Sequence, residues 1–251
     1  MPKPLQELQS QIETLRADVE FIRLASQLRP RIGRVLQWQA QGEEIALARQ
    51  FMNSRQSSAE AVYGPLLVRL LASLERYMRS TIAQIVDRKA ANSIGYDTLD
   101  GALGHRNLVL TGRLLSALDA PRDYLTFNVE ELIQNLASCT RGARKFKLNS
   151  VAFSSALGGV SPSFLERAFD NLDISGWWDR IGADARIAEL LGTKGPRATG
   201  DRAKARLKEL ARRRNQIAHG GDGEIVVSES EIADAIEFVG AFSAIFDTIV
   251  N

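Results

Sequence analysis

Apolar residues recur at every third or fourth position along most of this chain, and the alternation typical of a half-buried β-strand is almost absent. The longest stretch of this kind covers residues 58–90, with Pro65 in the first turns, where proline is tolerated. The same period predicts further helices at 97–118, 128–138, 161–171, 201–219 and from residue 228 onward, and short packed helices within 177–191. Residues 192–200 are expected to form a loop, because they are rich in glycine. The sequence therefore predicts an all-α fold.

Two of the predicted helices carry recognisable start signals. Ser161 and Pro162 have the residue types of an N-cap and of the first helical position. Ser228 and Glu231 have the spacing of a capping box, in which side chain and backbone bond reciprocally. These signals predict where the helix at 161–171 and the last helix of the chain begin.

Residues 1–28 carry an apolar seam of the coiled-coil type. Three heptads of three- and four-residue steps are formed by Leu5, Leu8, Ile12, Leu15, Val19 and Ile22. Such a seam pairs with a helix of another chain or packs on the chain's own core, and the spacing leaves both open. Pro30 is expected to end this helix or to begin a second, more polar helical segment at 33–55. We therefore divide the chain into an N-terminal helical region, 1–56, that packs on or extends from the core, and a helical domain, 57–251.

Composition narrows the kinds of site that the chain can hold. Cys139 is the single cysteine, which excludes an intramolecular disulfide and a cysteine-based zinc cluster. With only His105 and His219 there is little room for a multi-histidine metal site, and no cofactor is expected. The N-terminus lacks the unbroken apolar core of a signal peptide, and the longest apolar stretches carry charges. A cytoplasmic protein with no membrane partner is expected.

The near-neutral net charge of +2 conceals two oppositely charged segments. Residues 194–214 hold nine basic and two acidic residues, a net charge of +7, whereas residues 215–251 carry −7. A local basic surface can bind a polyanion even on a chain that is neutral as a whole. Lys208, Arg212 and Arg213 lie in the basic segment and are predicted to bind an RNA backbone. The simpler interpretation is a solvated helix face.

Arg214 and His219 stand at the C-terminal end of this basic helix, with Asn215 directly after the arginine. Asn215 and His219 are four positions apart and share a helix face, and Arg214 lies at its rim. Histidine exchanges a proton near neutral pH, and arginine stabilises negative charge on phosphate oxygens. The set therefore suits cleavage of RNA, whose own 2′-hydroxyl is the nucleophile, so that no metal is needed. In the simpler alternative, Arg214 pairs with a carboxylate and His219 only caps the helix.

One arginine and one histidine make a sparse active site. Two copies facing each other across a two-fold axis would place two of each around one phosphate, and a two-fold dimer is the commonest oligomer. The sequence therefore predicts a homodimer, if the chain is an enzyme.

The segment RRRNQIAHG, with the short connector and closing helix after it, resembles the HEPN superfamily, and more narrowly ribonucleases of the RiboL-PSP-HEPN type. The segments SPSFLERAFDNLDIS and VYGPLLVRLLASLERYM resemble the same group, so that the resemblance covers roughly residues 58–251. It implies an all-α homodimer that brings two Arg-x4-His motifs together and cleaves RNA without metal, leaving a 2′,3′-cyclic phosphate and a 5′-hydroxyl. It also implies that Arg214 and His219 are the catalytic pair and that Asn215 assists them.

Relatives of this type commonly act as toxins or in defence against phage, which implies an antitoxin or a defence-system partner protein. Those paired with nucleotidyltransferase antitoxins often carry tyrosine two residues after the histidine, where this chain has Gly221. Control by tyrosine modification at that position is therefore not supported. Two other functions stay open on the sequence: a non-catalytic module of HEPN type that binds RNA or nucleotide, and a helical adaptor.

Glu75 is a further candidate, because it interrupts the apolar stripe of the helix at 58–90. A carboxylate in such a position needs a partner, since burying it unpaired is costly. Arg214 or Asn215 provides that partner if the two helices pack together, in which case Glu75 supports the motif. The alternative is an exposed ion pair with Arg79, four positions along the same helix.

Overall fold

The computed structural model describes residues 3–36, 59–99, 101–117, 127–219 and 226–250, and the described residues form helices without strands. They are α1 (Pro4–Leu36), α3 (Ala59–Ala91), α4 (Gly101–Ser116), α5 (Val129–Ser138), α6 (Ser150–Ser155), α7 (Pro162–Asp170), α8 (Trp177–Gly182), α9 (Ala185–Leu191), α10 (Pro196–His219) and α11 (Glu229–Val250), with a 3-10 turn, η1 (Tyr96–Thr98). The predicted all-α fold is confirmed. None of the described helices is both long and apolar enough to cross a membrane.

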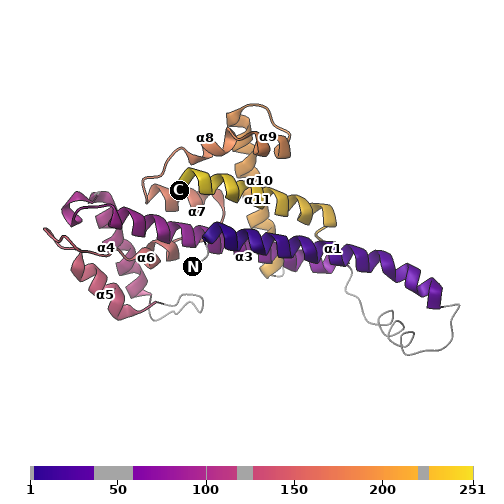
Figure 1. Cartoon of the computed structure of the whole chain (residues 1–251), viewed down its shortest axis with the longest axis horizontal. Coiled ribbons are helices and arrows are strands. Elements are labelled where there is room, and N and C mark those ends of the chain that lie inside the picture. Colours follow the sequence, from indigo (N-terminus) through magenta and orange to yellow (C-terminus); the bar gives the residue numbers. More distant parts are fainter. Residues whose placement is uncertain (1–2, 37–58, 100, 118–126, 220–225, 251) are drawn as a thin grey trace.

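The two longest helices organise the molecule. Figure 1 shows α1 and α3 side by side along the long axis, with α11 lying along them. The short helices α4, α5 and α6 gather around one end of α3, while α10 crosses α3 further along and carries α8 and α9 at its start. The basic helix of the candidate site is therefore held across the central helix of the fold.

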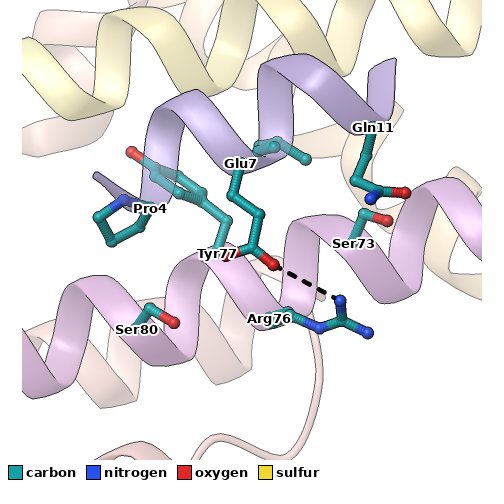
Figure 2. A pocket seen from close by; sticks show the side chains of 8 residues that line it. Pro4, Glu7, Gln11, Ser73, Arg76, Tyr77 and Ser80 are labelled. Carbon is teal, nitrogen blue, oxygen red and sulfur yellow. Dashed lines mark ion pairs between the residues drawn. The ribbon is translucent and has the colours of Figure 1, made fainter. Parts of the chain in front are cut away.

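The apolar seam of α1 packs on the chain's own core, which decides between the two alternatives for it. Leu8, Ile12 and Leu15 are at most 3% exposed, and they belong to the same hydrophobic core as α3 and α11. Polar contacts flank the seam, as Figure 2 shows for Glu7 of α1, whose carboxylate lies 3.7 Å from a guanidinium nitrogen of Arg76 on α3. The predicted domain division after residue 56 falls outside the described residues.

We expect Leu15→Ala to lower the free energy of unfolding by about 2–5 kcal/mol, because the side chain is fully buried and its removal leaves a cavity. Leu24→Ala on the same helix is the matched control, since Leu24 is 44% exposed and should cost under about 1 kcal/mol. Denaturant unfolding followed by circular dichroism measures both. Equal effects of the two substitutions would contradict the docking of α1 on this core.

Two predictions about helix ends are wrong. α1 does not stop at Pro30 but continues to Leu36. A proline inside a helix removes one backbone donor and clashes with the preceding turn, at a cost of about 3 kcal/mol, so that α1 continues through a local defect. The segment predicted at 33–55 is helical up to Leu36, and its remainder lies outside the described residues.

The predicted helix at 97–118 is divided into η1 and α4, and α6 was not predicted at all.

The predicted loop at 192–200 is only half correct, because α10 begins at Pro196 and includes Gly200. The physical reason is helix packing. A Cβ atom on Gly200 would lie 3.2 Å from the carbonyl oxygen of Trp178, and one on Gly182 would lie 2.1 Å from that of Pro196. These two glycines allow α8 and α10 to cross at close range. A glycine that serves a helix contact cannot be told from a loop glycine by composition.

Candidate active site

The C-terminal end of α10 lies against the start of α3. Leu207 and Leu210 of α10 are buried in the core, and near the helix end the Ile217 side chain packs over Gly64, where an added Cβ atom would lie 3.6 Å from it. The start of α11 reaches the same place. Burial, together with the adjacent Glu229 carboxylate of α11, raises the pKa of Tyr63 on α3. Three helix ends therefore meet beside the predicted motif.

Arg213 joins the end of α10 to the start of α11. Its Nη2 donates to the carbonyl oxygen of Val226 at 3.0 Å and lies 3.2 Å from Oε1 of Glu231. Glu231 and Ser228 form the predicted capping box: the Glu231 N–H donates to Ser228 Oγ at 3.2 Å, and the Ser228 N–H donates to Glu231 Oε2 at 2.9 Å. The guanidinium thus links the two helices, and the RNA-binding role expected for Arg213 stays a prediction.

Lys208, Arg212, Asn215 and His219 form an exposed stripe along α10, spaced four, three and four positions apart. Within the stripe, Nη1 of Arg212 donates to Oε1 of Gln216 at 2.7 Å. The stripe presents two cations and an amide to solvent and ends in an imidazole at the last residue of the helix. A phosphate backbone laid along it would reach His219.

Arg214 points in a different direction from His219. Five positions on an α-helix correspond to a rotation of about 140°, so the two side chains of one chain diverge. Arg214 lines a cavity of about 60 Å³ together with Asn215 of α10, Glu75 of α3 and the loop between α6 and α7. Its Nη1 donates to Oδ1 of Asn215 at 3.0 Å. Arg214 is therefore held at the cavity by Asn215, and it points to a different side of α10 from His219.

Glu75 has features of both alternatives. Its Oε1 accepts hydrogen bonds from Nε and Nη2 of Arg79 at 3.1 and 2.7 Å, which is the pair within one helix. However, the Glu75 side chain is only 23% exposed, and it lines the same cavity as Arg214 and Asn215. Arg79 also donates to the carbonyl oxygens of Ser154 and Leu157, so the pair holds the α6–α7 loop. Its role as a support for the motif stays a prediction.

Phe164 is a residue of this site that the sequence analysis missed. It stands in the first turn of α7, is 39% exposed, and lines the cavity of Arg214 from the side of the α6–α7 loop. The signal for it was present, because Leu165, Ala168 and Phe169 form the buried face of this helix and Phe164 lies beside that face. The Ser161–Pro162 start is confirmed in position, although the Ser161 side chain makes no capping hydrogen bond.

No group of three or more histidine, cysteine, aspartate or glutamate side chains within the described ranges is arranged to hold a metal ion. The candidate residues are two types of basic residue, arginine and histidine, with an asparagine and one paired carboxylate.

Residues 45–251 match the protein family described as RiboL-PSP-HEPN. The match begins after α1 and covers α3, α10 and α11, and with them all the predicted site residues. No curated protein and no solved structure matches the chain.

Proposed function

The chain belongs to the RiboL-PSP-HEPN family, and from this premise we propose that it is a metal-independent endoribonuclease that acts as a homodimer. Family membership supports an RNA-related function of HEPN type. The observation that carries the finer proposal is the end of α10, where an exposed histidine closes a row of two cations and an amide, and Arg214 is hydrogen-bonded to Asn215 of that row.

The proposed reaction uses the nucleophile that RNA provides. His219 removes the proton of a 2′-hydroxyl, whose oxygen then attacks the adjacent phosphorus. The bond from phosphorus to the 5′-oxygen breaks, and this oxygen takes a proton from water, while the proton held on His219 passes to the hydroxide that remains. Arg214 binds the non-bridging oxygens and stabilises the charge that develops on them. The products are a 2′,3′-cyclic phosphate and a 5′-hydroxyl.

The direction of the side chains supports the proposed dimer. Because Arg214 and His219 of one chain diverge by about 140° around α10, they do not converge on one phosphate within a single helix. A second chain related by a two-fold axis brings a histidine toward the first chain's arginine, and the reverse. Such an enzyme is dangerous to its own cell, so we place it as a cytoplasmic toxin or defence effector that a partner protein restrains.

Cleavage of a mixed-sequence single-stranded RNA is expected to proceed at the same rate, within about twofold, with EDTA in excess, because no step uses a metal. Gel electrophoresis of a labelled RNA measures the rate. The 5′ ends of the products should accept phosphate from polynucleotide kinase without prior phosphatase treatment.

A requirement for a divalent cation, or products ending in a 5′-phosphate, would contradict this mechanism. Binding that weakens steeply with salt and is accompanied by no cleavage would instead identify a non-catalytic RNA-binding module.

A further inference from the structure

The aromatic ring in the cavity of Arg214 is held against glycine backbone. A Cβ atom on Gly158 would lie 2.9 Å from Cε1 of Phe164, so the ring occupies the space that a larger residue would need. The adjacent Gly159 has a φ of 143°, which favours glycine. The loop is in turn fixed by Arg79, which donates to the carbonyl oxygens of Ser154 and Leu157. An exposed phenylalanine is thus kept in a fixed position beside the proposed catalytic arginine.

One carboxylate oxygen of Glu75 accepts no hydrogen bond from the described residues and is available to a ligand. The two hydrogen bonds that Glu75 accepts from Arg79 both end on its Oε1, and its Oε2 accepts none from the described residues. Asn215 also lines the cavity, and its Oδ1 accepts from Arg214, which leaves its amide N–H groups to donate. The cavity therefore offers one acceptor and one donor beside an aromatic side chain.

We propose that this cavity is a nucleobase subsite, in which an amino-bearing base of single-stranded RNA stacks on Phe164 and donates its amino N–H to Oε2 of Glu75. The inference rests on the proposed ribonuclease function. It specifies the class of base that the enzyme would hold next to the phosphate bound by Arg214. Aromatic side chains are the usual stacking platforms for unpaired bases, and stacking accepts any base. The cavity, at about 60 Å³, receives the edge of the base while the ring supports its face.

The carboxylate selects among the bases. An ionised carboxylate only accepts hydrogen bonds, and the bonds it accepts are stronger than neutral ones. Adenine, cytosine and guanine each present an exocyclic amino group, whereas uracil presents its single N–H between two carbonyl oxygens that the carboxylate repels. Bases with an amino group are therefore preferred over uracil at this position.

Binding of fluorescein-labelled RNA heptamers to the His219→Ala chain tests the proposal without cleavage, by fluorescence anisotropy. The heptamers are oligouridines with adenosine, purine riboside or uridine at the centre, and purine riboside differs from adenosine only by the missing amino group. We expect the adenosine heptamer to bind at least about fivefold more tightly than the other two, the worth of one good hydrogen bond to a charged group. Equal affinities for the three, or no binding of any of them, would overturn the subsite.

Substitutions separate the ring from the carboxylate. Phe164→Ala should weaken binding of the adenosine heptamer about five- to a hundredfold, and Phe164→Trp should retain it, because stacking is preserved. Glu75→Gln should remove the difference between adenosine and purine riboside, since Arg79 keeps the amide oxygen and turns the amide nitrogen to the cavity. Phe21→Ala is the matched control, because Phe21 is 71% exposed on α1. Retained affinity in Phe164→Ala would contradict the stacking role.

The outcomes distinguish this inference from the proposed function. If the wild-type chain cleaves RNA but the three heptamers bind equally, the proposed ribonuclease function is supported and the proposed nucleobase subsite is contradicted. If the adenosine heptamer is preferred and no RNA is cleaved, the subsite stands and the catalytic proposal falls. The comparison of the three heptamers changes the RNA and no residue of the cavity. It therefore tests the subsite even if the Glu75→Gln chain fails to fold.

Discussion

His219→Ala is expected to slow RNA cleavage by about 10²- to 10⁴-fold while leaving the fold intact, because general acid–base catalysis contributes a factor of this size. Arg214→Ala is expected to cost about 10²- to 10³-fold, the usual effect of removing one group that stabilises developing charge. Single-turnover cleavage of a labelled RNA measures both losses. His219 is exposed, so its substitution should change the free energy of unfolding by less than about 0.5 kcal/mol.

The chain offers a matched control for each substitution. His105, the other histidine, is exposed on α4, and Arg16 is exposed on α1, where it pairs with Glu13 of the same helix. His105→Ala and Arg16→Ala should therefore cleave as the wild type does. Full activity of both the His219→Ala and the Arg214→Ala chain would contradict the proposed mechanism. A comparable loss in His105→Ala would show that the assay reports something other than the motif.

Features that depend only on residues close together in the sequence, within one helix, could be predicted. The period of the apolar residues predicts α3, α10 and α11, because burial of one helix face depends on local spacing. The capping box of Ser228 and Glu231 was predictable for the same reason, since both of its hydrogen bonds span three positions.

Features that depend on two distant segments were not predictable. Gly182 and Gly200 resemble loop residues until α8 and α10 are seen to cross there. Phe164 belongs to the candidate site only because the α6–α7 loop brings it to Arg214, about fifty positions along the chain. The partner of Glu75 depended on how α3 and α10 pack, and the structure shows a carboxylate that pairs within its helix and still lines the same cavity as the other helix's arginine.

Mixing the two inactive variants is expected to restore cleavage, because the arginine and the histidine that act on one phosphate come from different chains. The two side chains of one chain are separated by about 140° around α10 and by about 7.5 Å along it. A heterodimer of Arg214→Ala and His219→Ala retains one functional arginine and one functional histidine, one on each chain. We expect a heterodimer isolated through two different affinity tags to cleave at least about tenfold faster than either homodimer, since removing a single such group costs at least about a hundredfold.

The double variant Arg214→Ala/His219→Ala, paired with a chain that carries either single substitution, is the control, because that heterodimer lacks every arginine–histidine pair and should stay inactive. If catalysis took place within one chain, the mixed heterodimer would contain no intact pair and would be as inactive as this control. Recovery in the mixed dimer alone therefore requires a site shared between two chains. A chain that is monomeric in light scattering at the assay concentration, yet cleaves RNA, would refute the shared site directly, and the divergence of Arg214 from His219 would then have to be closed by movement within α10.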